Sequence, residues 1–247
     1  DNLCPLVSKA HLERPLEFEP HVRIGDLDEN QMKADLSASP TSDMMEVVAA
    51  DMGFVQRLAM ANQWLLGGLV ESGFAASPQG NAMIRTTTAP TMLAGSAKEN
   101  VLAQRATALV NFRIHPDNTV QDVLDHIGDV TADIEGIEYA PVEGGIGSEA
   151  SPVSAVDNRP YGVLHAVATE IGNGAPVAPA LVIGATDARY ASAITKDVYR
   201  FAPSIVGPAD LAGFHGTNER LSVENMGNLS RGYAQIVMAM DEPETGE

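Results

Sequence analysis

Residues 106–132 read ATALVNFRIHPDNTVQDVLDHIGDVTA, and this stretch carries the two patterns that decide the fold. Residues 106–115 alternate apolar and polar side chains as a half-buried β-strand does, and the Pro-Asp-Asn turn at 116–118 ends it. Thr119 then stands at the N-cap position of a predicted helix over 120–132. A strand followed directly by a helix indicates a sheet that is covered by helices.

The segments on either side extend this prediction. Residues 83–93 (MIRTTTAPTML) are rich in Thr and indicate a strand bent at Pro90, and residues 137–142 indicate a third strand. Upstream, apolar residues recur at helical spacing over 44–74, with a break expected at Gly67-Gly68. A short helix is also expected over Pro5–Leu16, and 17–43 is a polar connector. These elements predict an α+β layer with one antiparallel sheet.

The pattern changes after a glycine cluster, Gly144 to Ser148, which is a candidate hinge. Helices and strands alternate beyond it. Helices are expected over 160–171, 187–194 and 222–240, and short strands over 180–183 and 198–201. The fold class expected for the whole chain is α/β, an α+β unit followed by part of an α/β domain.

Composition excludes several classes of function. The 247 residues contain 33 acidic and 15 basic side chains, a net charge of −18. Such a surface repels phosphate backbones and anionic lipid headgroups, so neither nucleic acid nor a membrane is expected as a partner. Cys4 is the single cysteine, which excludes an internal disulfide and a cysteine-rich zinc site. With no signal-like N-terminus, a cytoplasmic location is expected for the chain as given.

Three segments contain residue types that can act in catalysis or bind a ligand. His215 stands in the polar loop FHGTNER (214–220), which can form a binding loop or a plain turn. Asp187 and Arg189 follow the expected strand at 180–183, where ligands bind in α/β sheets, although an ordinary surface ion pair also fits. Arg113 faces the opposite side of its strand from Phe112. It can bind a carboxylate through two parallel hydrogen bonds, or it can simply face solvent.

Two further histidines have structural interpretations. His115 ends a strand just before a turn, a position that suits a cleft but also an ordinary strand end. His165 lies among apolar residues of a predicted helix and is expected to be a core histidine. The sequence contains no GxSxG, SxxK, GxGxxG or HExxH motif and no P-loop, which argues against ordinary serine hydrolases, nucleotide-dependent enzymes and zincins.

Six ordered motifs resemble a known family. The chain is similar to the zinc aminoacylase/carboxypeptidase (ArgE/DapE) metallopeptidases, in their branch of carboxypeptidase S and N-acyl-amino-acid hydrolases. The motifs that carry the resemblance are RTTTAPTM (85–92), KENV (98–101), VNFRI (110–114), GATDAR (184–189), VYRFAP (198–203) and HGTNER (215–220).

This resemblance implies an amide hydrolase with two zinc ions and a lid domain that forms a homodimer. Residues 1–147 would be the lid, and residues 148–247 the C-terminal part of the catalytic domain. His215 looks like a zinc ligand, and Asn100 and Arg113 look like the groups that hold the carboxylate of an N-acyl amino acid or small peptide. Thr186 and Arg189 fall on the substrate-side loop.

The sequence also departs from the family. The His-x-Asp motif, the remaining zinc ligands, the general-base glutamate and the first strand of the lid are absent, so no catalytic residue is identifiable. We therefore expect an incomplete hydrolase whose isolated chain binds little zinc, with a sheet edge that seeks a partner. The alternative is a dimerising module without metal chemistry, or a hydrolase that works through His215, Asp187 and Arg189.

Overall fold

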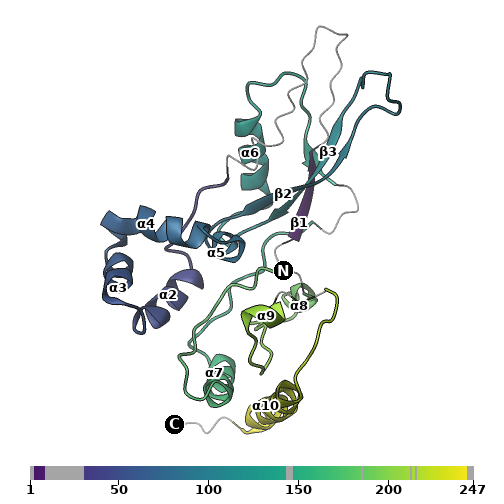
Figure 1. Cartoon of the computed structure of the whole chain (residues 1–247). Helices are drawn as coiled ribbons and strands as arrows, with labels where there is room; N and C mark the ends of the chain where they lie inside the picture. Colours follow the sequence, from purple (N-terminus) through teal and green to yellow (C-terminus); the bar gives the residue numbers. More distant parts are fainter. Residues whose placement is uncertain are drawn as a thin grey trace.

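The computed structural model describes residues 3–8, 31–142, 147–184, 186–211, 213–214 and 216–243. A four-stranded antiparallel sheet forms the upper part of the molecule in Figure 1, and its strand order is β2-β3-β1-β4. The strands are β1 (Leu3–Ser8), β2 (Thr87–Ala94), β3 (Thr107–Arg113) and β4 (Ala140–Pro141). The expected mixture of helices and an antiparallel sheet is confirmed.

The strand and helix predicted from 106–132 form the core of this part. Ala108, Val110 and Phe112 alternate along β3 and are buried. They share a core with Val123 and Ile127 of α6 (Val120–Val130). The period-2 face of β3 therefore meets the apolar stripe of α6, as the pattern predicts.

Thr119 caps α6 as predicted. Its hydroxyl accepts a hydrogen bond from the N–H of Asp122 at 3.1 Å, and the Asp122 carboxylate accepts one from the N–H of Thr119 at 2.7 Å. This reciprocal pair is a capping box, and it satisfies two backbone donors at the start of the helix. The side-chain and backbone hydrogen bonds from Thr119 lower the pKa of Asp122.

The strand over 83–93 begins later than predicted. Residues 78–84 form α5 (Pro78–Ile84), which has Pro at its first position and is capped by the Ser77 hydroxyl. Proline at that position favours a helix start, and this signal outweighs the strand pattern up to Ile84. The expected bend at Pro90 is present as a register shift between Pro90 and Met92, because proline has no N–H to donate to the ladder.

The N-terminal segment differs from its prediction. Leu3–Ser8 is a strand, not the start of a helix over Pro5–Leu16, and the rest of that helix lies outside the described residues. β1 pairs with β3 from Leu3↔Arg113 to Ser8↔Ala108, on the edge away from β2. An extended backbone lets this short segment share the hydrogen-bonding groups of β3, which a helix could not do. The prediction that a missing strand leaves an open edge is therefore wrong for β3.

The predicted helices over 44–74 are present as a compact group. They are α2 (Thr41–Ala49), α3 (Phe54–Ala61) and α4 (Gln63–Ala75), which pack around Met45, Ala59 and Val70. The break lies at Asn62, whose side chain bonds to the carbonyl of Leu58 at 2.9 Å, and α4 continues through Gly67-Gly68. A Cβ at Gly67 or Gly68 would meet nothing within 4 Å, so neither position requires glycine for close packing.

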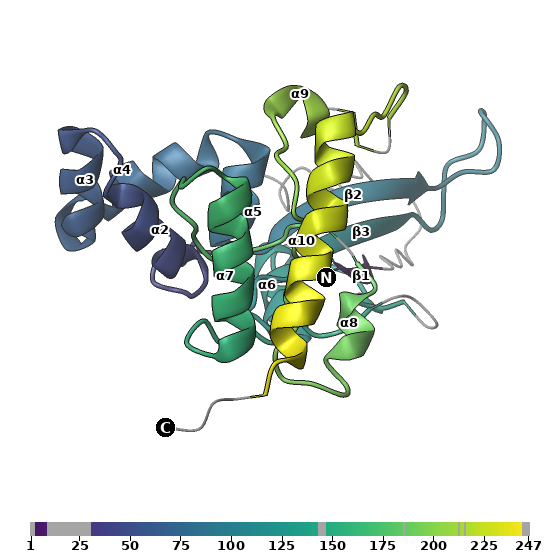
Figure 2. The same cartoon turned by 90° about the horizontal axis from the view of Figure 1, so that it is seen from below.

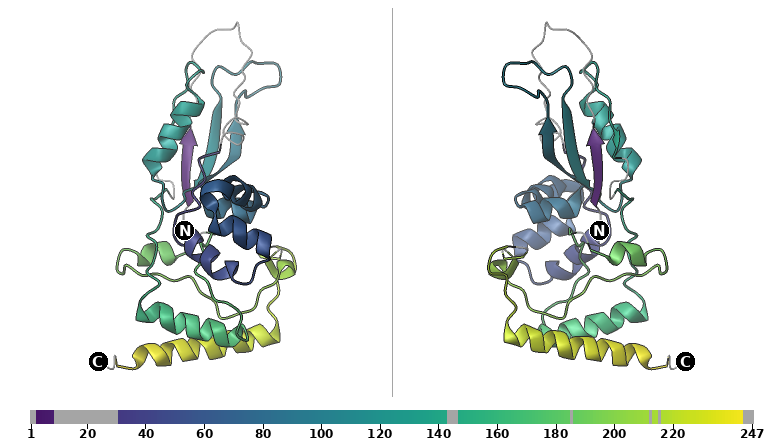
Figure 3. Two further views of the ribbon diagram at one scale, coloured as in Figure 1. Left: turned by 90° about the vertical axis from the view of Figure 1, so that its left-hand side faces the viewer. Right: turned by 90° about the vertical axis from the view of Figure 1, so that its right-hand side faces the viewer.

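Helices dominate the C-terminal part. They are α7 (Arg159–Ile171), α8 (Ala188–Ala191), α9 (Pro208–Leu211) and α10 (Val223–Asp241). α7 and α10 lie side by side in Figure 2, and in Figure 3 they form the green and yellow layer farthest from the sheet. Both of the long predicted helices are confirmed, and Ser222 caps α10 as expected. The candidate hinge falls largely on residues 143–146, outside the described chain.

The two strands expected at 180–183 and 198–201 are not formed. A strand needs a neighbouring strand for its N–H and C=O groups, and neither segment has one among the described residues. Val198 instead bonds through its N–H and its carbonyl to the hydroxyl of Ser154, at 2.8 and 3.1 Å. The Ile183 carbonyl accepts a hydrogen bond from the Arg113 side chain.

Two glycines of α10 provide a test of how this helix packs. A Cβ at Gly232 would lie 2.5 Å from the Cβ of Pro203 and 3.1 Å from the Cδ1 of Ile171, whereas one at Gly227 meets nothing within 4 Å. We expect Gly232→Ala to lower the free energy of unfolding by about 1–3 kcal/mol through overpacking. Gly227→Ala should raise it by up to about 1 kcal/mol through helix propensity. Urea denaturation measures both, and equal effects would contradict this packing.

Candidate functional site

Arg113 connects the sheet to the C-terminal part. It is the last residue of β3, where the alternation that buries Phe112 leaves Arg113 exposed. Its Nη1 donates a hydrogen bond to the carbonyl of Ile183, 70 residues later in the chain. This contact holds the segment before α8 against the end of β3. A guanidinium has five N–H donors, so one bond to a carbonyl leaves capacity for an anion.

The segment that Arg113 contacts carries the other predicted substrate-side residues. Thr186 follows Ile183 by three residues, which places it within about 11 Å along the chain. Its hydroxyl accepts a hydrogen bond from the N–H of Ala188 at 3.2 Å, at the start of α8. Arg189 lies one residue further, with its Nη2 2.6 Å from the Tyr190 hydroxyl and its guanidinium carbon 4.6 Å from the centre of the Tyr190 ring. The contact at Ile183 thus links Arg113 to the segment that leads to Thr186 and Arg189.

Asn100 stands apart from this region. Asn100 is exposed in the turn between β2 and β3, where Val101 bonds to the Lys98 carbonyl at 3.3 Å. The length of β3 alone, from Thr107 to Arg113, spans about 20 Å, so one chain does not bring Asn100 and Arg113 to the same carboxylate. His215 lies outside the described residues.

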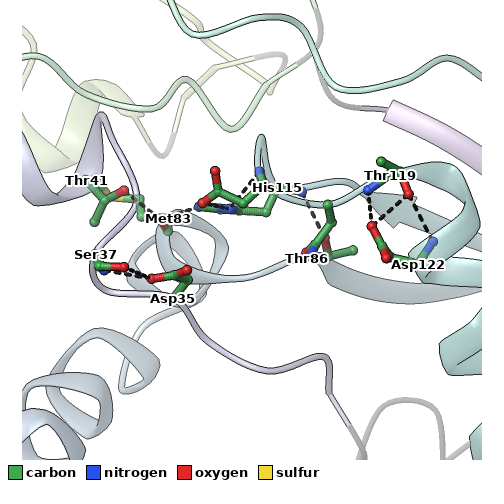
Figure 4. A network of polar contacts seen from close by, with 10 residues as sticks. Asp35, Ser37, Thr41, Met83, Thr86, His115, Thr119 and Asp122 are labelled. Carbon is green, nitrogen blue, oxygen red and sulfur yellow. Dashed lines mark hydrogen bonds and ion pairs between the residues drawn. The ribbon is translucent and has the colours of Figure 1, made fainter.

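His115 belongs to a polar network and not to a cleft (Figure 4). The residue is 3% exposed. Its N–H donates to the Thr86 hydroxyl at 2.9 Å, and its Nε2 lies 3.2 Å from the Met83 carbonyl. The Thr41 hydroxyl donates to that same carbonyl at 2.7 Å. His115 therefore joins the end of β3 to α5 and α2, which is a structural role.

A cavity of about 470 Å³ lies against α7. Tyr161 and His165 of α7 line it together with Tyr199, Arg200 and the apolar coils at 151–156 and 175–182. His165 is exposed here, so its expected place in the core is wrong. Sequence reasoning missed this cavity, whose one signal is the Pro- and Ala-rich run APVAPALV (175–182).

Burial sets the protonation of the polar groups around this cavity. It raises the pKa of the Tyr161 and Tyr199 hydroxyls and lowers the pKa of the Arg200 guanidinium. The phenols stay neutral and the Tyr199 hydroxyl lies 2.9 Å from Oδ1 of Asn158. Apolar walls with neutral hydroxyls and one cation suit a mainly apolar ligand that has one polar end.

The described residues do not fit a metal centre. Among them, no three His, Cys, Asp or Glu side chains lie close enough together to hold a metal ion. Nor does the described part of the chain contain a helix that is both long and apolar enough to cross a membrane.

Comparison with known proteins agrees with the motifs. Residues 27–135 match the M20 peptidase dimerisation domain. The chain is 35% identical over 216 residues to an N-fatty-acyl-amino acid synthase/hydrolase of Xenopus tropicalis. The aligned residues are 87% of this chain and 41% of that protein. A probable carboxypeptidase S-like protein of Dictyostelium discoideum is 28% identical over 194 residues, 78% of this chain and 37% of its own length. The chain thus spans about two fifths of the length of these relatives.

Asp35, at one end of the network in Figure 4, provides a test of its electrostatics. Its carboxylate accepts hydrogen bonds from the Ser37 hydroxyl at 2.6 Å and the Ser37 N–H at 2.8 Å. These bonds, with a smaller contribution from nearby His115, lower its pKa below 3.8. The stabilisation is therefore present above the pKa of the unfolded chain and is lost as the pH falls through the lower folded value.

We expect Ser37→Ala to raise the pKa of Asp35 toward its ordinary value, measured by NMR titration of the carboxyl carbon. Ser72→Ala, which removes an exposed hydroxyl from α4, should leave it unchanged. If Asp35 titrates at the same pH with and without the Ser37 hydroxyl, the assignment is wrong.

Proposed function

This chain belongs to the M20 peptidase family, on the branch of the N-acyl-amino-acid hydrolases, and we propose that it supplies the dimerisation domain and the substrate-side groups of an amide hydrolase. The proposed substrate is an N-acyl amino acid or small peptide with a free carboxylate. The observation that carries this proposal is the contact between Arg113 and Ile183, which brings a lid guanidinium to the loop of Thr186 and Arg189.

The chemistry of this region suits a carboxylate. In this proposal the guanidinium groups of Arg113 and Arg189 serve the same site, in a chain with a net charge of −18. Arginine holds a carboxylate through two parallel hydrogen bonds, and the Thr186 hydroxyl offers a further donor. In such an acidic protein, this local positive charge defines where a small anion binds.

The division of the chain follows the same reasoning. Residues 1–147 form the lid and dimerisation domain in this proposal, and residues 148–247 form the C-terminal part of the catalytic domain. The dimerisation-domain match at 27–135 lies within the first of these units.

The position of Asn100 supports a homodimer. If Asn100 and Arg113 both contact the substrate carboxylate, one of them must come from a second subunit, because the length of β3 separates them within a chain. The β2–β3 hairpin projects from the molecule in Figure 1 and would carry Asn100 across to the partner.

Light scattering should give the mass of two chains, and a monomer at every concentration would contradict the proposal.

M20 enzymes are generally metal-dependent, and zinc is the proposed metal. His215 is its candidate ligand in this chain. Because the described residues contain no cluster that fits a metal ion, the remaining ligands and the general base belong, in this proposal, to residues beyond those described.

A dimerising module without hydrolytic chemistry is the second candidate, and the absence of a metal-binding cluster among the described residues favours it. A hydrolase without metal, working through His215, Asp187 and Arg189, would need His215 beside α8, where Asp187 and Arg189 lie. A module that only dimerises should bind a ligand with a free carboxylate and the corresponding amide equally. The proposed hydrolase should prefer the carboxylate, so this preference distinguishes the two candidates.

Binding of N-acetyl-phenylalanine and of N-acetyl-phenylalaninamide tests the proposal, because the two differ only in the carboxylate. We expect calorimetry to show that the acid binds about tenfold to 100-fold more tightly than the amide. This ratio corresponds to the contribution of one charged hydrogen bond, here between Arg113 and the carboxylate. Arg113→Met should remove this difference, whereas Arg105→Met, at an exposed position two residues before β3, should keep it. Equal affinity of the wild-type chain for acid and amide would overturn the proposal.

A further inference from the structure

The turn that ends α7 contains the one Asn-Gly pair of the chain, Asn173-Gly174. Asn173 has a φ of 53° and Gly174 a φ of 81°, so both residues lie in the left-handed region. The N–H of Gly174 donates to the carbonyl of Thr169 at 2.9 Å, and the N–H of Asn173 donates to the carbonyl of Glu170 at 3.2 Å. These two hydrogen bonds form a Schellman motif, in which asparagine takes the left-handed position that glycine usually occupies.

An asparagine that precedes a glycine is prone to lose its side-chain amide. The backbone nitrogen of the glycine gives up its proton and attacks the Cγ atom of the asparagine. A C–N bond forms, ammonia leaves, and water opens the resulting succinimide ring to aspartate or isoaspartate. Glycine favours the attack because it has no side chain to hinder the nitrogen. In this chain the attacking atom is the nitrogen of Gly174, and Asn173 is exposed to the water that the second step consumes.

The Schellman motif binds the same nitrogen that this reaction needs. While the N–H of Gly174 donates to the Thr169 carbonyl, its proton is withheld from the base that must remove it. Contacts with α10 hold the turn closed, since Nε2 of Gln235 donates to Oε2 of Glu170 at 2.8 Å and Ile171 is buried. The reaction therefore waits for the last turn of α7 to open, and helix ends open at a lower free energy than the core.

We propose that Asn173 is a site of spontaneous deamidation whose rate is set by the opening of the last turn of α7. Neither the chemistry nor its control depends on the proposed function. The reaction is irreversible and adds a negative charge to a chain that already carries −18.

Both products weaken the end of α7. Isoaspartate adds a carbon atom to the main chain between residues 173 and 174, so the two hydrogen bonds of the motif no longer form together. Aspartate places a negative charge at the C-terminal end of a helix, where the helix dipole disfavours it. Gly172 and the coil at 175–182, on either side of the pair, line the cavity against α7. Deamidation therefore loosens one wall of that cavity.

Asn218 is an internal control for the backbone conformation. It is exposed and has a φ of 65°, so it shares the left-handed backbone of Asn173. The residue that follows it is Glu219, whose side chain hinders the attacking nitrogen. A difference in rate between the two asparagines therefore reports the residue that follows, and not the left-handed conformation itself.

Incubation of the 247-residue protein at mildly alkaline pH, followed by mass spectrometry of its peptides, measures the reaction. We expect Asn173 to deamidate faster than Asn218, and about tenfold more slowly than the same asparagine in a free peptide of residues 167–179, as the local opening of a helix end requires. Hydrogen exchange of the Gly174 amide, measured by NMR, should be slowed by the same factor, because the same opening frees its N–H.

Two matched variants test the control by the helix end. Gln235→Ala removes the hydrogen bond to Glu170 and should make deamidation of Asn173 about threefold faster, as the loss of one hydrogen bond provides. Gln121→Ala removes a similar hydrogen bond, to Asp125 at 2.7 Å on α6, and should leave the rate unchanged.

Three outcomes would refute this inference. The first is deamidation of Asn173 in the folded chain as fast as in the free peptide, which shows that the motif does not control the reaction. The second is a rate no greater than that of Asn218. The third is an equal rate in the two glutamine variants. None of these readouts involves a substrate, so the carboxylate preference tests the hydrolase proposal separately.

Discussion

The hydrogen bond from Arg113 to the Ile183 carbonyl is the interaction on which the proposed site depends. It joins the last residue of β3 to a segment 70 residues later, which the local sequence does not hold in any helix or strand. It holds the segment before Thr186 and Arg189 against the end of the sheet. The same guanidinium that positions the loop is the group proposed to bind the carboxylate, so binding and positioning are coupled through one side chain.

Local signals predicted the long C-terminal helices and α6 well, because the groups that begin a helix are neighbours in sequence. Thr119 and Ser222 both cap helices with their hydroxyls, and α7 and α10 run nearly as their apolar spacing indicates. The strands at 180–183 and 198–201 were wrong for the opposite reason. A strand is stabilised by a neighbour from elsewhere in the chain, and the pattern of one segment does not show whether that neighbour is present.

The candidate site was predictable in part. The motifs identified Arg113, Thr186 and Arg189 as substrate-side groups, which stays a prediction, and no pattern within the sequence shows the contact of Arg113 with Ile183. Asn100 was grouped with Arg113, but the length of β3 separates them. His115 was considered for a cleft, but it is buried and contacts Thr86 and Met83, about 30 residues away. Distances of this kind follow from tertiary packing and not from local spacing.

We propose that the chain provides the substrate side of an M20 hydrolase and does not by itself form the metal centre. The most direct measurement is the zinc content per chain, by elemental mass spectrometry, after purification without added metal and dialysis against a zinc buffer. We expect a ratio well below one, because a zinc site needs about four ligands and the described residues hold no cluster that could complete a site with His215. A ratio of one or two zinc ions per chain would contradict it.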